Sequence, residues 1–180
     1  MSGGATLKIG ILEGGAMRKG EARETRPFWR TKTLEEMTPS EWEALCDRCG
    51  WCCVVKWIDP ATDEVCHSRV ACRLLDLETC RCRNYRDRRR VMSDCVRLTP
   101  TRVRRMNWLP WNCAYRRLKE GRGLPRWHPL VTGDPESVHR TGRSARGRLT
   151  SEADPPMEEP QDRLGSPALR SSGPLSDRKM

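Results

Sequence analysis

The sequence predicts an α+β fold, a small loop-rich single domain that combines short helices with a β-hairpin. Three observations predict it: a helix start signal at residues 38–41, two β-like runs at residues 54–58 and 64–70, and ten cysteines confined to residues 46–113. At 180 residues the chain has the size of one domain with one modest core. Most of the cysteines lie between the predicted elements, as expected for a chain that folds back on them.

The first predicted helix begins at Pro39. Thr38 is a favourable cap and Glu41 stands three residues after it, which together predict a reciprocal capping box with proline at the first helical position. Apolar residues then recur at helical spacing as far as Cys49, and Gly50 favours a tight or left-handed turn. We therefore expect a helix from Pro39 to Cys49.

A β-hairpin is predicted directly after this helix. Residues 54–58 form an apolar β-like run, residues 59–63 contain Asp, Pro and Thr as a turn does, and residues 64–70 return as a second strand. The two runs are close in sequence, so we expect them to pair with each other.

Short helices are predicted in the second half of the domain. Residues 85–91 form a polar, Arg-dense candidate, and Thr99 with Pro100 can begin another helix. Asn112 is a favourable cap for a helix over residues 113–120, which Gly121 would end. Because a helix amino terminus favours negative charge, we expect the Cys113 thiol at this position to have a lowered pKa.

Composition divides the chain into three parts. We predict a flexible N-terminal extension at 1–25, a cysteine-cluster metal-binding domain at 26–152, and a disordered C-terminal tail at 153–180 that is rich in Pro, Ser, Arg and Asp. Only 36% of the residues are apolar, and seven Trp beside one Phe and two Tyr predict a core with few large anchors. The formal net charge is +10.

No apolar stretch approaches the roughly 20 residues of a membrane span, and no secretory signal is apparent at the amino terminus. We therefore expect a cytoplasmic protein with no membrane partner. Ten cysteines in that compartment stay reduced unless a metal holds them, which argues against a disulfide framework.

Four thiols within eight residues form the densest cluster in the chain: Cys46, Cys49, Cys52 and Cys53. Thiolates bind zinc and iron far better than magnesium or calcium, and C-x2-C spacing lets two sulfur atoms hold one ion. Four neighbouring thiols cannot all be buried core side chains, so the cluster predicts a metal site. A lone Cys66 in the second strand is interpreted instead as a small buried apolar residue.

Further motifs follow in a defined order: Val70-Ala71-Cys72-Arg73, Thr79-Cys80-Arg81-Cys82-Arg83-Asn84-Tyr85, Asp94-Cys95, Trp108-Leu109-Pro110, Cys113-Ala114-Tyr115-Arg116 and Trp127-His128-Pro129-Leu130. With the cluster, this series resembles the YcgN-type cysteine-cluster family of YkgJ-like CxxCxxCC proteins over residues 26–152. The resemblance implies a zinc- or iron-chelating protein whose physiological role is unassigned. It implies nine metal ligands: Cys46, Cys49, Cys52, Cys53, Cys72, Cys80, Cys82, Cys95 and Cys113.

Zinc and an iron–sulfur cluster both fit these residues. Zinc is favoured by the paired C-x2-C and C-x-C elements and by a small fold that needs a cysteine-ligated metal as a staple. An iron–sulfur cluster is favoured by the C-x2-C-x2-C run. Eight of the nine thiols could form two tetrathiolate sites, or His128 could replace one thiol, so the division between sites stays open.

The histidines and arginines have simpler interpretations. His128 and His139 are interpreted as turn or loop histidines. The basic run from Arg81 to Arg90 is interpreted as a solvated face that also donates hydrogen bonds to anionic sulfur. The alternative is a phosphate-binding stripe of a basic, zinc-stabilised nucleic-acid-binding protein, although Tyr85 is the only nearby side chain that could stack on a base.

Catalytic motifs are missing from the sequence. No Ser-His-Asp order, phosphate-binding glycine loop or nucleotide fingerprint is present, so no catalytic residue is assigned and enzyme status stays open. An iron–sulfur redox component of an enzyme system is a further alternative. Metal binding is the functional prediction that the residues support.

Overall fold

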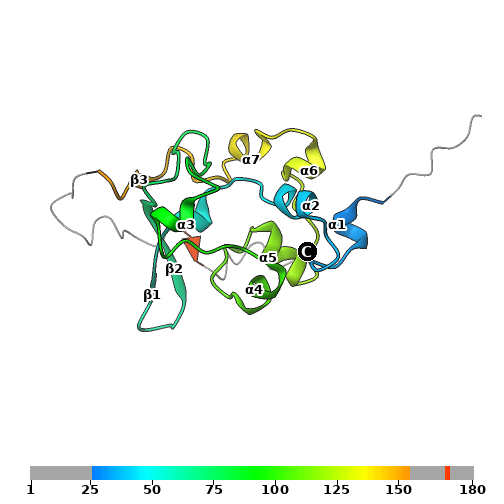
Figure 1. The fold of residues 1–180 in the computed structure, drawn as a ribbon, viewed down its shortest axis with the longest axis horizontal. Helices are drawn as coiled ribbons and strands as arrows, with labels where there is room; N and C mark the ends of the chain where they lie inside the picture. Colours follow the sequence, from blue (N-terminus) through cyan, green and yellow to red (C-terminus); the bar gives the residue numbers. More distant parts are fainter. Residues whose placement is uncertain (1–25, 155–168, 171–180) are drawn as a thin grey trace, which may run out of the picture.

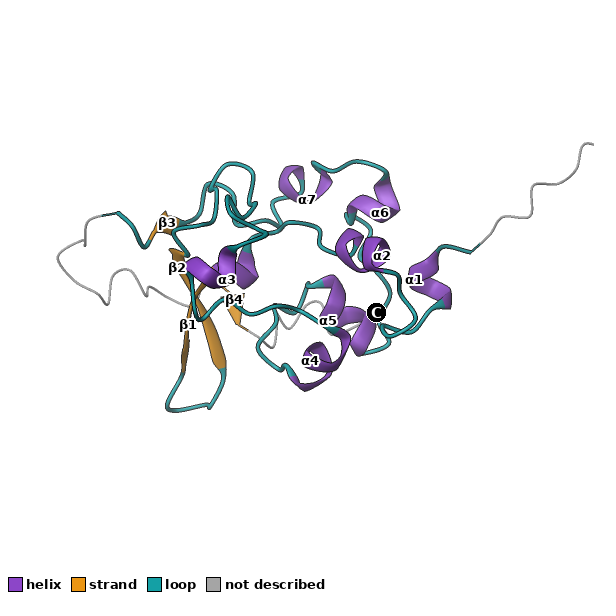
Figure 2. Ribbon diagram, viewed as in Figure 1, coloured by secondary structure: helices purple, strands orange, loops and turns teal. Residues whose placement is uncertain are grey.

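A computed structural model describes residues 26–154 and 169–170 (Figure 1). They form an α+β domain with a small sheet at one end and most of the helices at the other, joined by long loops (Figure 2). The fold class predicted from the sequence is therefore confirmed. The elements in chain order are α1 (Phe28–Thr31), α2 (Pro39–Ala44), the 3-10 turn η1 (Trp51–Cys53), β1 (Val54–Ile58), β2 (Val65–Ala71), α3 (Arg88–Val91), α4 (Pro100–Arg105), α5 (Ala114–Lys119), α6 (Pro129–Thr132), α7 (Ser137–Arg140), β3 (Thr150–Ser151) and β4 (Leu169–Arg170).

The two ends of the chain lie largely outside the described residues. This applies to the whole extension expected at 1–25 and to most of the tail expected at 153–180. Within that tail, the structure describes residues 153–154 and the two residues of β4. In the part of the chain that the structure describes, every helix is too short or too polar to span a lipid bilayer.

The capping box predicted at the start of α2 is confirmed. Thr38 Oγ1 accepts a hydrogen bond of 3.3 Å from the Glu41 amide, and Glu41 Oε2 accepts one of 2.8 Å from the Thr38 amide. Pro39 occupies the first turn, where its missing amide hydrogen costs no helical hydrogen bond. This start signal orients α2 so that Trp42 is buried in the core.

The end of α2 differs from the prediction. The helix ends at Ala44 instead of continuing to Cys49. Asp47 Oδ1 accepts a hydrogen bond of 3.1 Å from the Cys49 amide, which gives the backbone a local partner in place of a helical one. Arg48 has a φ of +61°, which a right-handed helix cannot accommodate. The cysteine motif therefore lies on a loop that begins directly after the helix.

The predicted hairpin is confirmed, and it forms the centre of a small mixed sheet. Strands β1 and β2 pair antiparallel, with an irregularity between Val54 and Lys56. Strand β3 pairs parallel with the end of β2 at Val70 and Ala71, and β4 pairs antiparallel with the start of β2 at Cys66 and His67. Strand β2 is therefore central, with β1 on one edge and both short strands on the other.

The later helices are shorter than predicted. Thr99 caps α4 as expected. Helix α5 begins at Ala114 with Cys113 as its N-cap, one position later than expected, and Asn112 is buried. Helix α3 covers only residues 88–91, because the Arg88 guanidinium donates a 2.6 Å hydrogen bond to the carbonyl of Tyr85 and holds the preceding residues in a turn.

Two apolar clusters pack the domain. The larger one joins α2, α4 and α5, and the Trp42 and Tyr115 rings lie 4.6 Å apart within it. Its buried members are Leu34, Trp42, Leu45, Val103, Leu109, Ala114 and Tyr115. The smaller cluster combines Cys49 and Trp51 of the cysteine motif with Val138 and Ala145 from the last third of the chain. The cysteine motif is thus packed between two small cores.

Candidate metal centre

The loop after α2 and the turn η1 carry the four cysteines of the C-x2-C-x2-C-C motif. Gly50 has a φ of +82° and redirects the chain between the second and third of them. The sulfur atoms of Cys52 and Cys53 lie 3.8 Å apart. Cys113 joins them from α5, close enough for the charges of its neighbours to shift its pKa. We call Cys46, Cys49, Cys52, Cys53 and Cys113 the first thiol group.

The members of the first thiol group act on one another electrostatically. Desolvation by the surrounding protein and the charge of Cys52 raise the pKa of Cys46 to about 12, although Cys46 keeps exposed surface. Burial raises the pKa of Cys49. A hydrogen bond from the Cys53 thiol and the charge of Lys56 lower the pKa of Cys52 to about 7, against the opposite effect of burial. Cys52 is therefore the member of this set that loses its proton most readily.

The low pKa expected for Cys113 is wrong. Burial raises the pKa of Cys113 well above that of an ordinary thiol, and the hydrogen bond from the Arg116 amide offsets only part of this effect. The sequence shows the helix amino terminus but not the burial that outweighs it. A buried neutral thiol is nevertheless a competent ligand once a metal displaces its proton.

A second set of thiols lies beyond the hairpin. Cys72 follows β2, and Cys82 is brought back toward it by an isolated antiparallel bridge between Leu75 and Cys82. Burial raises the pKa of Cys72, and the charges of Glu152, Cys82 and Cys95 add to the rise, so these side chains lie within electrostatic range. We call Cys72, Cys82 and Cys95 the second thiol group.

The backbone ties the two groups together. The Cys72 amide donates a hydrogen bond of 2.9 Å to the carbonyl oxygen of Cys53. The side chain of Lys56 lies within electrostatic range of Cys52, Cys53 and Cys72, so it stands between the groups. The two thiol groups therefore share one backbone contact and one neighbouring cation.

Cys80 packs against the cysteine motif without joining either group. Its side chain is buried, and its backbone has a φ of +53°. A Cβ atom at Gly50 would lie 3.2 Å from Cys80 Sγ, so the glycine is needed for this close approach as well as for its own left-handed φ. Burial raises the pKa of Cys80, while the charge of Arg146 opposes the rise.

The comparisons with known proteins identify the family of this chain. The family model CxxCxxCC, described as "Putative zinc- or iron-chelating domain", matches residues 45–114, which contain all nine candidate cysteines. A relative named UPF0260 protein from Caulobacter vibrioides is 54% identical over 127 residues, covering 71% of this chain and 78% of the relative. The chain belongs to the UPF0260 family. The resemblance to CxxCxxCC proteins seen in the sequence is thereby confirmed.

Other UPF0260 relatives show similar coverage. One from Azotobacter vinelandii is 54% identical over 132 residues, covering 73% of this chain and 89% of its own. One from Rhizorhabdus wittichii is 57% identical over 127 residues, covering 71% of this chain and 87% of its own. No solved structure matches the chain. The description of the matching family model names both zinc and iron and does not choose between them.

Asp47 is a site residue that the sequence analysis missed. It stands inside the UPF0260 cysteine motif, is only 4% exposed, and uses Oδ1 to accept the Cys49 amide. Its Oδ2 atom is buried and has no hydrogen-bond partner among the described residues. Burial raises the pKa of Asp47, and its charge in turn raises the pKa of Cys46 and Cys113. A carboxylate oxygen is a recognised zinc ligand, and the residue's place between two cysteines was the available signal.

His128 is a structural residue in this fold. It is fully buried, its Nδ1 accepts a hydrogen bond of 3.1 Å from the Leu130 amide, and its Nε2 lies 3.1 Å from the carbonyl oxygen of Leu45. An Nδ1 that accepts a hydrogen bond carries no proton, so Nε2–H is the donor to Leu45. Both ring nitrogen atoms are occupied, which agrees with the interpretation of His128 as a packed turn histidine. Cys66 is likewise buried, with 1% of its surface exposed.

The donor set fits a soft or borderline metal ion. It combines thiols from four segments with one buried carboxylate oxygen that lacks a partner among the described residues. Among residues 26–154 and 169–170, no three Cys, His, Asp or Glu side chains stand close enough together to hold an ion as they are. Metal binding at this centre therefore requires the side chains of a thiol group to draw together as their protons leave.

Proposed function

We propose that this chain is a metal-binding protein that holds zinc or an iron–sulfur cluster through its two thiol groups. The observation that carries the proposal is the position of Cys113, which α5 brings within electrostatic range of Cys46 and Cys52. A thiol that packs beside the motif from so distant a segment would close a ligand set around one centre. Thiolate ligands suit both metals, so the donor atoms alone do not separate them.

The proposed ligands come from all nine cysteines named in the sequence analysis. The first thiol group supplies the four thiols of the motif and the nearby thiol of Cys113. Asp47 would either coordinate the metal through its carboxylate oxygen or accept a hydrogen bond from a ligand. The second thiol group supplies three, with Cys80 as the remaining candidate. A bound zinc ion would supply folding energy, and a bound cluster would supply electron transfer.

We also propose residues 26–152 as the metal-binding domain and the cytoplasm as its compartment. The nine candidate ligand cysteines are free thiols in the structure, which suits a reducing environment. The described elements from α1 to β3 lie within these boundaries. Protein that was isolated with intact disulfides would argue against this compartment.

Removal of the metal tests the structural role. Because the domain has only two small apolar clusters, we expect chelated protein to lose most of its circular dichroism signal and its cooperative thermal transition. Readdition of zinc or iron to reduced protein should restore both. Chelated, demetallated protein that keeps its full spectrum and melting temperature would contradict a structural metal.

Anaerobic purification tests the cluster alternative, in which the chain is an iron–sulfur redox component of an enzyme system. The adjacent thiols of Cys52 and Cys53, 3.8 Å apart, are compatible with ligation of one cluster or of two neighbouring centres. Iron with acid-labile sulfide and visible absorption would support this alternative. Colourless protein that contains zinc and neither iron nor sulfide would eliminate it.

A second candidate function is nucleic-acid binding, which the formal net charge of +10 favours. Parts of the basic run are neutralised, since Arg83 pairs with Asp76 at 3.5 Å and Arg90 with Asp87 at 3.4 Å. Arg88 covers the Tyr85 ring at 3.8 Å from its centre, so a base cannot stack on that face. Binding to an oligonucleotide that weakens steeply with added salt would support this candidate, and no binding at low salt would remove it.

A further inference from the structure

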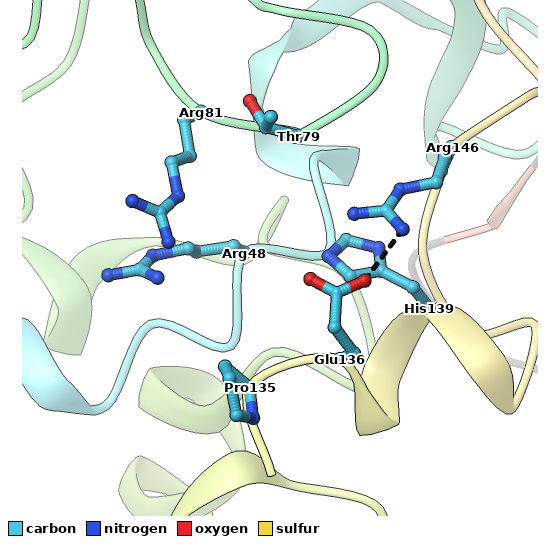
Figure 3. Close-up of a pocket in the computed structure, with 7 residues that line it drawn as sticks. All are labelled: Arg48, Thr79, Arg81, Pro135, Glu136, His139 and Arg146. Carbon is cyan, nitrogen blue, oxygen red and sulfur yellow. Dashed lines mark hydrogen bonds and ion pairs between the residues drawn. The ribbon is translucent and has the colours of Figure 1, made fainter.

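A cavity of about 140 Å³ lies beside the cysteine motif and has a strongly basic lining (Figure 3). Three arginines line it: Arg48 from the motif itself, Arg81 from the Cys80–Cys82 segment, and Arg146 from the loop after α7. In Figure 3, Arg48 and Arg81 reach into one side of the cavity, while Arg146 lies opposite with His139 and Glu136. Three distant segments thus supply cations to one small space.

Unusual backbone conformations hold two of these arginines in place. Arg48 has a φ of +61°, and Cys80, which directly precedes Arg81, has a φ of +53°. Neither residue is a glycine, so each conformation is unfavourable locally and must be maintained by the surrounding fold. Backbone strain of this kind gathers at binding and catalytic sites in proteins.

The charges around the cavity are unbalanced. Glu136 Oε2 accepts a hydrogen bond of 2.7 Å from the Arg146 guanidinium, so these two charges offset each other. Among the described residues, no carboxylate forms a salt bridge with Arg48 or Arg81. Three guanidinium groups against one carboxylate leave a net charge of +2 at the cavity.

The other polar groups at the cavity already have partners. The Thr79 hydroxyl donates a hydrogen bond of 3.0 Å to Asp76, so the guanidinium groups supply the free donors. These are Arg48, Arg81 and the buried Nε–H of Arg146, which has no partner among the described residues. His139 Nδ1 lies 2.8 Å from Ser144 Oγ, and burial lowers the pKa of His139. A ligand would therefore be recognised by the guanidinium groups and not by hydroxyl groups.

We propose that this cavity binds a phosphate group. Guanidinium groups match the oxygen atoms of phosphate with paired hydrogen bonds, and a phosphate monoester carries close to two negative charges at pH 7. The cavity volume of about 140 Å³ is that of several water molecules at about 30 Å³ each. This volume accommodates one phosphate group and leaves any attached nucleoside outside. None of the proposed metal ligands lines the cavity, although the charge of Arg48 acts on Cys46 and the charge of Arg146 acts on Cys80.

Calorimetric titration of the metal-loaded full chain tests the proposal. The probes are inorganic phosphate and adenosine monophosphate at constant ionic strength in chloride buffer. The variants are Arg81→Gln and Arg48→Asn, the latter because asparagine tolerates a left-handed backbone. Arg89→Gln removes the same charge from an exposed position on α3 and serves as the matched control.

Wild-type protein should bind at least one probe. Arg81→Gln and Arg48→Asn should each raise the dissociation constant by about tenfold or more. Arg89→Gln should raise it by less than about twofold. Tighter binding of the nucleotide would assign the phosphate to a nucleotide, and equal binding would assign it to free phosphate. Metal content measured in the same samples separates failure here from failure of the metal proposal. The proposal would be overturned if wild-type protein bound neither probe, or if Arg89→Gln weakened binding as much as Arg81→Gln does. If Arg48→Asn does not fold, the result for Arg81→Gln decides the test alone.

Discussion

The Nζ atom of Lys56 lies 4.6 Å from the centre of the Trp108 ring, in a cation–π contact that crosses from β1 to the loop before α5. The same ammonium donates hydrogen bonds of 2.7 Å and 2.8 Å to the carbonyl oxygens of Cys52 and Val54. Burial lowers the pKa of Lys56, while the neighbouring thiols Cys52, Cys53 and Cys72 oppose the shift. Lys56 therefore brings positive charge to the boundary between the two thiol groups.

Replacement of Lys56 by Met keeps the aliphatic stem and removes the charge and the donor. We expect the free energy of unfolding to fall by roughly 1–3 kcal/mol, because two carbonyl groups lose their partner. We also expect metal content per chain to fall, since a fully ligated thiolate site is anionic. Lys119→Met is the control, because Lys119 also donates a hydrogen bond to a backbone carbonyl, that of Met106 at 2.6 Å. Equal metal loss in both variants would contradict a role for Lys56 at the thiols.

Gly50 should be intolerant of any side chain. Gly50→Ala forces a left-handed φ of +82° on a residue with a Cβ and brings that atom within 3.2 Å of Cys80 Sγ. The strained φ costs about 1–3 kcal/mol, and displacement of Cys80 adds to it. Gly121→Ala has a similar φ of +71° but meets no atom within 4 Å. Chemical denaturation should show a larger loss of unfolding free energy for Gly50→Ala than for Gly121→Ala. Equal losses would mean that the contact with Cys80 does not contribute to stability.

His128 should prove structural by its effect on stability without metal loss. His128→Asn preserves a good N-cap for α6 and removes most of a buried ring that bonds the Leu45 carbonyl. We expect a loss of roughly 1–3 kcal/mol in unfolding free energy with unchanged metal content per folded chain. If the variant instead loses metal as Cys113→Ser does, His128 is a ligand after all.

The capping box of α2 predicts a pH dependence away from the thiols. A hydrogen bond from Lys32 and one from the Thr38 amide lower the pKa of Glu41 below its ordinary value of 4.5. A lowered carboxylate pKa gives stability that is complete above the ordinary value and is lost as pH falls through the lower folded-state value. The stability difference between wild type and Glu41→Gln should therefore be constant near neutral pH and shrink below pH 4.5. A difference that persists unchanged in acid would show that the carboxylate charge is not involved.

Local signals in the sequence account for the parts of the fold that were predicted correctly. The side chains of Thr38 and Glu41 each accept a hydrogen bond from the other residue's backbone amide. Strands β1 and β2 are joined by a short turn in which the Asp59 amide donates a hydrogen bond of 2.9 Å to the Glu64 carbonyl. Such contacts depend on residues a few positions apart, so composition and spacing are sufficient to predict them.

The errors arise from one local side-chain contact and from packing between distant segments. The early end of α2 depends on Asp47, whose side chain competes with the helix for the Cys49 amide. The raised pKa of Cys113 depends on burial by other segments. The division of the thiols into two groups, with Cys80 behind Gly50, follows from tertiary packing that spacing along the chain does not encode.

Metal analysis of anaerobically purified single-cysteine variants tests the central claim most directly. Zinc, iron and acid-labile sulfide would be measured per chain in wild type, in Cys113→Ser from the first thiol group, in Cys95→Ser from the second, and in Cys66→Ser as the control. We predict metal in the wild type, a reduced content in both Cys113→Ser and Cys95→Ser, and no change in Cys66→Ser, whose buried side chain lies in β2. Wild-type protein without zinc or iron, or a Cys113→Ser variant with full metal content, would contradict the account.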